Sequence, residues 1–170
     1  MNTKHFLDIV LGPDGHYCLW ANRGAGSEKE IFQEFYSSVA DLYEAAQDWD
    51  SRGWNAFFAL GTFEKAGSRL ADNVKGMKSF FLDLDCGPED KKGFLSQRAA
   101  IQELQGFCKR HKLPKPVLIN SGRGIHVYWI LSEAVCRDDW QPVAERLKML
   151  CVADGFAADP SVTADAARVL

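Results

Sequence analysis

The chain has 170 residues, of which 46% are hydrophobic and 25% charged, and its formal net charge is −3. This size and balance are those of a globular domain with a real hydrophobic core. No apolar stretch approaches the roughly 20 residues that a membrane-spanning helix needs, and the first residues show no signal-peptide cleavage site, so we expect no contact with a membrane. The negative charge excludes a whole-molecule attraction to nucleic acid, so any basic contact must be local.

The cysteines and histidines argue against two common kinds of metal site. Five cysteines are scattered along the chain, odd in number, and no two of them form a CxxC pair. This pattern favours reduced intracellular thiols over a zinc site or a disulfide framework. The four histidines are equally scattered, which argues against a multi-histidine metal site.

In the amino-terminal part, the sequence predicts a strand over residues 16–21 and then a helix that begins at a capping box of Ser27 and Glu30. Apolar residues recur at steps of three and four up to Trp49, which is typical of one buried helix face, and the helix is expected to end near Gly53. Two further strands are predicted over residues 55–63 and 78–85, and the loop GPEDKKG (87–93) follows the second of them.

In the carboxyl-terminal part, two helices flank a predicted hairpin. The first helix spans about 96–111, with a buried face of Ile101, Leu104, Phe107 and Cys108. Strands over 117–120 and 125–131 are joined by the short turn SGRG. The second helix, led by Asp138 and Asp139, is expected to bury Trp140, Val143, Leu147 and Leu150. Strands that alternate with helices, plus one hairpin, predict an α/β (α+β) fold with a mixed β-sheet flanked by helices, in a single domain over 1–170.

Two carboxylates, Asp83 and Asp85, end the apolar run SFFLDLD. In a strand they would share one face and lie about 6–7 Å apart, close enough to reach one divalent ion or to bridge two. Their hard oxygen atoms favour Mg²⁺ or Mn²⁺ over zinc. The alternative is that the strand ends at Asp83 and that both carboxylates are solvated.

A second group of polar residues lies in the stretch INSGRGIHVYW. Its turn offers the Ser121 hydroxyl, the Arg123 guanidinium and unhindered backbone N–H groups at Gly122 and Gly124, and His126 follows on the strand. Such donors suit phosphate oxygens. The alternative is an ordinary tight hairpin with a half-exposed histidine.

A third acidic stretch, FAADPSVTADAARVL, closes the chain. Asp159 precedes Pro160, which restricts its backbone, and Arg168 follows among small residues. Asp154 and Asp165 are competing carboxylates, and an ordinary surface loop is the alternative interpretation.

Together, the three stretches resemble the archaeo-eukaryotic primase (AEP) superfamily, especially the primase-polymerase (PrimPol) domains of phages, plasmids and related mobile elements. FFLDLD matches the strand-borne DxD motif with Asp83 and Asp85. GRGIHVYW matches the SxH-type motif with His126, although Gly124 stands where other branches carry serine. AADPSVTADAARVL matches the third motif with Asp159 as its acid.

The resemblance covers roughly residues 61–170. In mobile-element relatives the ARVL stretch continues through an arginine and a Pro-Gly-Thr-like turn, whereas this sequence stops at Leu170, so we expect a catalytic domain that is truncated at its carboxyl terminus. The family implies an AEP catalytic core with an RRM-like element, in the cytoplasm of a bacterium or a phage-infected host cell.

The resemblance also implies an activity: a DNA-dependent primase/polymerase that makes and extends primers by two-metal nucleotidyl transfer. Two Mg²⁺ or Mn²⁺ ions would be held by Asp83, Asp85 and Asp159. The incoming nucleotide would be bound by Ser121, Arg123, Gly124, His126 and Arg168. The implied partners are nucleoside triphosphates (NTP or dNTP), a single-stranded DNA template, and a replicative helicase or a C-terminal helicase domain.

Because the chain is acidic, template binding needs local basic residues. The candidates are Arg69, Lys75 and Lys78, and the segment KRHKLPK (109–115), although a charged helix end is more often solvated surface. Trp129 and Phe81 are expected in the core.

Two alternatives to an active primase remain open. The first is a catalytically inactive nucleotide- or nucleic-acid-binding module of the same fold. The second is a haloacid-dehalogenase-like phosphatase, which also places DxD after a hydrophobic strand. That family usually has threonine or valine where this chain has Gly87, and the GRGIH hairpin has no place in it.

Overall fold

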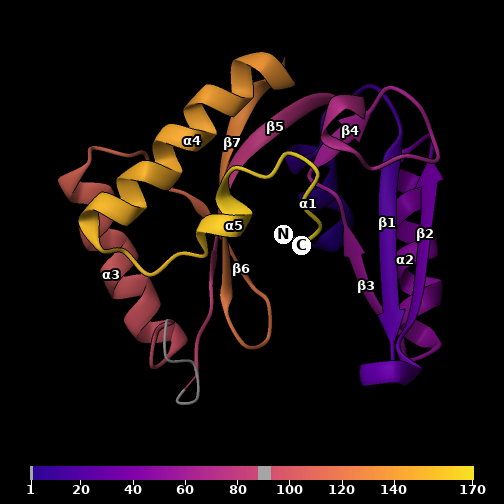
Figure 1. Ribbon diagram of the computed structural model, residues 1–170, viewed down its shortest axis with the longest axis horizontal. Coiled ribbons are helices and arrows are strands. Elements are labelled where there is room, and N and C mark those ends of the chain that lie inside the picture. Colours follow the sequence, from indigo (N-terminus) through magenta and orange to yellow (C-terminus); the bar gives the residue numbers. More distant parts are fainter. Residues whose placement is uncertain (1, 88–92) are drawn as a thin grey trace. The chain divides into compact units, whose positions relative to one another are not determined.

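The computed structural model describes residues 2–87 and 93–170, so most of the predicted loop GPEDKKG lies outside the described residues. The chain divides into two compact units, and Figure 1 labels their elements. Unit 1 consists of Met1–Lys78, Ser132–Arg137 and Ala166–Leu170, and unit 2 of Ser79–Leu131 and Asp138–Asp165. Each unit is described by itself.

Unit 1 contains a three-stranded antiparallel sheet in the order β2-β1-β3. Its strands are β1 (Tyr17–Arg23), β2 (Glu30–Tyr36) and β3 (Asn55–Phe58). The side chains of Cys18, Leu19 and Ala21 on β1 are fully buried. The observed β1 confirms the strand that the sequence predicts over 16–21.

Helices α1 (Thr3–Val10) and α2 (Val39–Ser51) complete unit 1, together with short 3-10 turns at Gly26–Glu28 and Ala71–Asn73. The sequence interpretation missed α1. Its signals are local: the Asn2 side chain accepts a hydrogen bond from the His5 N–H, and Phe6, Leu7 and Val10 form its buried face.

The first half of the helix predicted after Ser27 is wrong, because residues 30–36 form strand β2 and pair with β1 over their whole length. Helix α2 begins only at Val39, and its cap is Ser38, whose Oγ accepts the Asp41 N–H at 3.1 Å. The apolar residues of the predicted helix do not share one buried face, because Phe32 and Phe35 point to opposite faces of β2 and Leu42 alone among them is buried. The rings of Phe32 and Trp49 lie 4.2 Å apart, but they belong to a strand and a helix that pack together.

The strand predicted over 55–63 is two strands in different sheets, β3 and β4 (Gly61–Phe63). Between them, Ala59 forms a bridge with Val169, and Phe58 and Leu170 exchange backbone hydrogen bonds of 3.1 and 3.0 Å. The last residues of the chain therefore pair with this segment inside unit 1.

The second sheet has the strand order β4-β5-β7-β6. Strands β5 (Val74–Leu84) and β7 (Ile125–Cys136) contribute residues to both units, and β6 (Val117–Asn120) belongs to unit 2. Strands β6 and β7 pair antiparallel, which confirms the predicted hairpin around SGRG. Strands β4 and β5 also pair antiparallel.

The helices described in the second half of the chain are α3 (Gln97–Arg110), which comes between β5 and β6 in the sequence, and α4 (Arg137–Asp154) and the short α5 (Pro160–Thr163), which come after β7. Helix α3 agrees with its prediction, and Ser96 caps it. Helix α4 buries Trp140, Ala144 and Cys151, while Val143 is 46% exposed, so that its predicted burial is wrong. The buried face of α4 includes Ala144 instead of Val143.

Alternation along β5 and β7 separates two faces of the sheet in unit 2. One face packs with α3 in a buried cluster that contains Leu82, Leu84, Ile125, Val127 and Trp129. The opposite alternation places Asp83 of β5, and His126 and Tyr128 of β7, on the other face. Trp129 and Phe81 are buried, as predicted.

The structure also bears on two expectations from the sequence, which concern membrane-spanning helices and disulfides. None of the described helices is long and apolar enough to cross a membrane. All five cysteines are among the described residues, and none of them forms a disulfide.

Candidate active site

The first acidic motif lies at the end of β5. Leu82 and Leu84 are fully buried, whereas the Asp83 side chain between them keeps 17% of its surface exposed. Asp85 is exposed and follows the last residue of the strand. One carboxylate therefore belongs to the sheet and the other lies just beyond its end, in a position where both can reach solvent.

The third acidic motif lies directly beside the first. The backbone N–H of Asp159 donates to the carbonyl oxygen of Asp83 at 3.1 Å. The Asp159 carboxylate accepts hydrogen bonds from the backbone N–H and the hydroxyl of Ser161, both at 2.8 Å, and so caps α5. The structure thus joins the backbones of two motifs that are far apart in sequence, while the Asp159 carboxylate is engaged by its own helix.

In the part of the chain that the structure describes, no group of three or more His, Cys, Asp and Glu side chains is arranged to hold a metal ion. Asp83 and Asp85 nevertheless supply the carboxylate oxygens that Mg²⁺ and Mn²⁺ prefer. Asp159 could join them by turning its side chain away from Ser161, because its backbone is already fixed next to Asp83.

His126 faces the first motif from the neighbouring strand. Its Nε2 lies 3.8 Å from Oδ1 of Asp83, and its Nδ1 lies 3.3 Å from the Tyr128 hydroxyl. Burial lowers the pKa of His126 to about 4, so the ring is neutral near pH 7 and the contact with Asp83 is not an ion pair there. Burial, and secondarily the Asp83 carboxylate, raise the pKa of Tyr128, which keeps its hydroxyl protonated.

The contact between Tyr128 and His126 allows two arrangements of the ring proton. If the Tyr128 hydroxyl donates to Nδ1, the single proton of the neutral ring is on Nε2, the nitrogen that lies 3.8 Å from the Asp83 carboxylate. In that tautomer, His126 is an uncharged hydrogen-bond donor at the acidic edge of the sheet.

The SGRG turn is closed by its own hydrogen bonds. The Ser121 hydroxyl accepts the Gly124 N–H at 3.2 Å, and Asn120 Oδ1 accepts the Gly122 N–H at 2.8 Å. The expectation of unhindered N–H groups at Gly122 and Gly124 is therefore wrong. Ser121 and Arg123 are exposed and extend the polar surface of the turn.

Gly124 brings this turn against the first motif. A Cβ atom built on Gly124 would lie 2.4 Å from the carbonyl oxygen of Leu84 and 3.4 Å from the Cα of Asp85. Only a residue without a side chain allows this approach. Gly124 thus lets the turn lie on the end of β5.

Gln97, which the sequence interpretation missed, holds the turn from the other side. Its Nε2 lies 2.8 Å from Asn120 Oδ1 and 3.1 Å from the carbonyl oxygens of both Gly122 and Gly124. The only signal in the sequence is its place directly after Ser96, the residue that caps α3. Its partners become visible only in three dimensions.

Arg168 belongs to unit 1. Its carbonyl oxygen accepts the Leu60 N–H at 3.2 Å, and its Nε is buried without a hydrogen-bond partner among the described residues. A buried N–H without a partner carries a desolvation cost that a bound anion or water would remove. Its role in nucleotide binding stays a prediction from the sequence.

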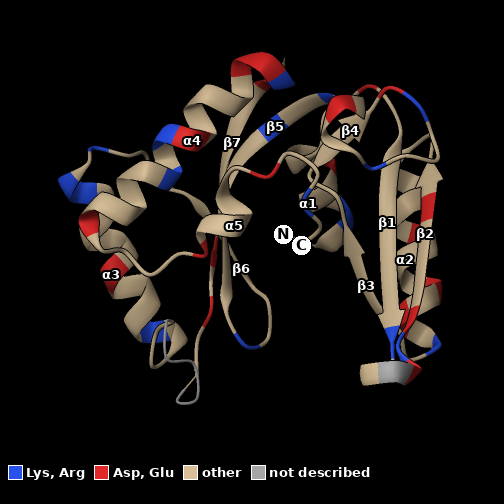
Figure 2. Ribbon diagram, viewed as in Figure 1, with Lys and Arg blue, Asp and Glu red and all other residues tan. Residues whose placement is uncertain are grey.

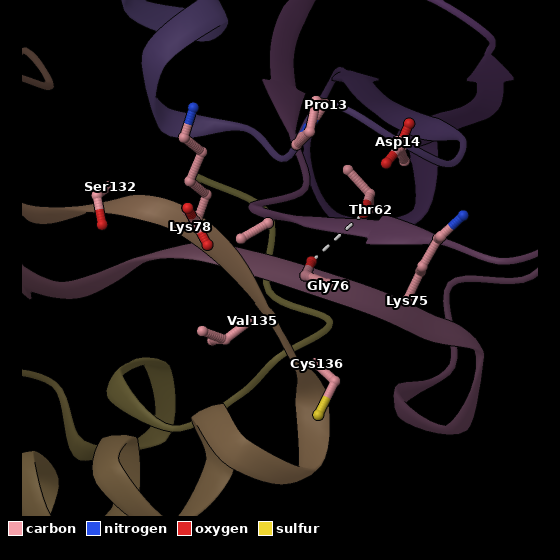
Figure 3. A pocket seen from close by; sticks show the side chains of 11 residues that line it. Pro13, Asp14, Thr62, Lys75, Gly76, Lys78, Ser132, Val135 and Cys136 are labelled. Carbon is pink, nitrogen blue, oxygen red and sulfur yellow. Dashed lines mark hydrogen bonds between the residues drawn. The ribbon is translucent and has the colours of Figure 1, made fainter.

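Two of the basic residues proposed for the template line one pocket of unit 1 (Figure 3). The pocket has a volume of about 390 Å³, and the Lys75 and Lys78 side chains rise from β5 on either side of Gly76. Asp14 and Glu133 also line it. The third candidate, Arg69, is engaged elsewhere in the unit, by the carbonyl oxygen of Ala167 and by Gln33.

Comparison with known proteins identifies the fold. No family model matches the chain, and no curated protein matches its sequence. Among solved structures, the AEP domain (PP-N190) of the primase-polymerase (PrimPol) of cyanophage S-2L has a TM-score of 0.65 at 16% sequence identity, over 98% of this chain and 77% of that chain. The chain therefore has a mixed α+β fold of the AEP type, with antiparallel strand pairs flanked by helices, as predicted.

Proposed function

We propose that this chain is a primase-polymerase that adds nucleotides to a primer on a single-stranded DNA template. The observation that carries the proposal is the hydrogen bond of 3.1 Å from the Asp159 N–H to the Asp83 carbonyl oxygen, which joins the third acidic motif to the first. The AEP-type fold supports it independently, because its similarity to a solved PrimPol domain extends over 98% of the chain.

The proposed cofactors are two Mg²⁺ or Mn²⁺ ions, held by Asp83, Asp85 and a reoriented Asp159. When bound, such ions make the primer 3′-hydroxyl more acidic and stabilise negative charge on the α-phosphate. The protein's own contribution is to fix the carboxylates. Asp83 is set by strand β5 and the Asp159 backbone is tied to it, so the rearrangement that binding requires of Asp159 is a turn of its side chain away from Ser161.

The nucleotide would lie against the SGRG turn and His126. The exposed Arg123 guanidinium suits phosphate oxygens. His126 would donate its Nε2–H to a phosphate oxygen while it remains uncharged. Ser121 and Gly124 shape the turn, and Ser121 keeps an exposed hydroxyl next to it.

Primer synthesis tests the proposal directly. The wild-type chain is incubated with a single-stranded DNA template, labelled ribo- or deoxynucleotides, and Mn²⁺ or Mg²⁺. We expect primers from the wild type and a loss of about a thousandfold in Asp83→Asn. Asp50→Asn, an exposed acid on α2, is the matched control and should retain full activity. Equal product from Asp83→Asn and the wild type would refute the mechanism.

One observation favours the inactive binding module of the same fold, namely the engagement of the Asp159 carboxylate with Ser161. Calorimetric titration with nucleoside triphosphates and Mn²⁺ distinguishes the two. Metal-dependent binding by a folded chain that yields no primer with either metal would establish the module. The AEP-type fold does not favour the third candidate, a haloacid-dehalogenase-like phosphatase. Release of phosphate from small phosphate monoesters would reveal such an activity.

A further inference from the structure

Unit 2 contains an apolar groove with a rim of lysines that has no part in the proposed chemistry. It has a volume of about 400 Å³ and lies between one face of α3 and the segment 113–118. The aliphatic residues of its lining are Ile101, Leu104, Leu113 and Leu118. The charged residues of its lining are Lys109, Lys112 and Lys115, and we call it the lysine-rimmed groove.

The groove is formed by apolar residues on one side of α3 and by Leu118 on β6. Ile101, Leu104 and Cys108 recur at steps of three and four, so that they lie on one side of α3, and Lys112 follows just beyond the end of the helix. Facing them is Leu118 of β6, which is 38% exposed. Strand β6 is at the end of the sheet order, and among the described strands it pairs with β7 alone, so no described strand lies along its other edge.

The basic residues near the groove differ in whether they bind a carboxylate. Arg110 and His111 lie between the lysines in sequence and both bind Asp154, with 3.2 Å from Arg110 Nε and 2.9 Å from His111 Nε2. Within the described ranges, the three lysines form no ion pair, and no acidic residue lines the groove. In Figure 2 the colour of Lys and Arg marks the end of α3 and the loop after it.

We propose that the lysine-rimmed groove binds an acidic peptide segment of a partner protein, in which carboxylates flank one or two large apolar side chains. The apolar side chains would cover Leu118 and its aliphatic neighbours, and the carboxylates would pair with the lysines. A volume of about 400 Å³ is in the range of sites that take a small apolar group. Salt bridges at the rim would mainly select the partner and speed association.

The lining favours a peptide over single-stranded nucleic acid. Single-strand binding sites combine basic residues with aromatic side chains on which bases stack. None of the described residues that line this groove is aromatic, and its floor is aliphatic. The lysines alone would give a nucleic acid only phosphate contacts, with no surface suited to its bases.

A labelled peptide tests this surface without any catalytic readout. The probe is a fluorescent ten-residue peptide with four aspartates on either side of two central leucines, and binding is followed by fluorescence anisotropy in low salt. We expect a dissociation constant in the range of about 10–100 μM, as for a small charged interface. Peptides with asparagine for aspartate, or serine for leucine, should bind at least about tenfold more weakly.

Variants of the exposed rim and floor locate the site. The double variant Lys109→Glu with Lys115→Glu, and the single variant Leu118→Ser, should each weaken peptide binding by about tenfold or more. Lys148→Glu on α4 is the control, because it makes one such charge reversal outside the groove. Circular dichroism confirms that each variant is folded.

Three results would overturn the proposal: no binding of the peptide by the folded wild type, equal loss in Lys148→Glu, or equal binding of the serine-substituted peptide. A labelled deoxythymidine 20-mer is tested in parallel. If it binds, the lysine variants abolish its binding and the peptide does not bind, the groove is a nucleic-acid contact instead. That last outcome would assign the lysines of the segment 109–115 to the template. The three overturning results do not bear on primer synthesis, so this proposal and the proposed function fail separately.

Discussion

The acidic end of β5 in unit 2 and the lysine pocket in unit 1 are built in opposite ways. At the end of β5, backbone contacts fix the parts: the Asp159 N–H bonds to Asp83, and Gly124 lies against Leu84. In the pocket, Lys75 and Lys78 project from β5 on flexible stems, and neither forms an ion pair within the described part of the chain.

The difference separates two kinds of function. Phosphoryl-transfer chemistry depends on carboxylates and donors held to within fractions of an ångström, so one added methyl group at the acidic end should matter greatly. Attraction of a template depends on the number of positive charges and falls gradually as they are removed. Changes at the two regions should therefore differ in size and in kind.

Among the new substitutions that test this contrast, Gly124→Ala should reduce primer synthesis most. The new Cβ would lie 2.4 Å from the Leu84 carbonyl oxygen, so that the turn and the end of β5 must separate. We expect a loss of about 2 kcal/mol in the free energy of unfolding and a loss of about a hundredfold in primer synthesis. Urea unfolding and the primer assay measure the two.

Gly106→Ala is the matched control for this substitution. Gly106 lies inside α3, where its Cβ would meet only the flexible end of Arg110, so the exchange should leave activity intact and stabilise by up to about 1 kcal/mol. A fully active and stable Gly124→Ala protein would contradict the idea that backbone contact defines the acidic edge.

How far the sequence predicts this molecule differs between elements. The β6–β7 hairpin and α3 were predictable, because short turns, caps and periodic burial are local. Strand β2 was not predictable, because the spacing of its apolar residues also fits a helix. Its pairing with β1, which is a tertiary contact, determines that this segment is a strand. The hydrogen bond from the Asp159 N–H to the Asp83 carbonyl oxygen and those from Gln97 to the SGRG turn join segments that are distant in sequence. Local sequence patterns carry no information about such contacts.

Acidification should destabilise the acidic edge in a defined window. Burial lowers the pKa of His126 to about 4 in the folded chain, below the ordinary 6.5, so the unfolded chain binds the extra proton first. Stability is then full above about pH 6.5 and falls as pH drops toward 4, by about 3 kcal/mol at most. Urea unfolding between pH 7 and pH 4 measures this slope.

His126→Gln should flatten that slope, since glutamine does not titrate. Asp154 provides an internal contrast, because Arg110 and His111 lower the pKa of its carboxyl to about 2. Its stabilisation is present above the ordinary pKa of 3.8 and is lost only as pH falls through 2, below the His126 window. An unchanged slope in His126→Gln would assign the effect to other groups.

Gln97→Glu should have an intermediate effect. The substitution keeps the shape of the side chain but replaces its donor with a carboxylate that faces Asn120 Oδ1 and the carbonyl oxygens of Gly122 and Gly124. We expect a loss of about 1–2 kcal/mol in stability and a rise of several-fold in KM for the nucleotide, because the turn loosens. Gln102→Glu, an exposed position on the same helix, should change neither.

The double variant Lys75→Ala with Lys78→Ala should have the smallest effect, confined to template affinity. If both lysines contact phosphates, binding of single-stranded DNA should weaken about threefold to tenfold at low salt, and the slope of log K against log salt should fall by about 1.4. The nearby acids Asp14 and Glu133 already reduce the local positive potential, so Glu133→Gln should strengthen binding slightly. Lys4→Ala, a surface lysine paired with Asp8, is the control. A fall in kcat without a change in the salt slope would show that the pocket serves the chemistry and not the template, and the contrast between the two regions would be lost.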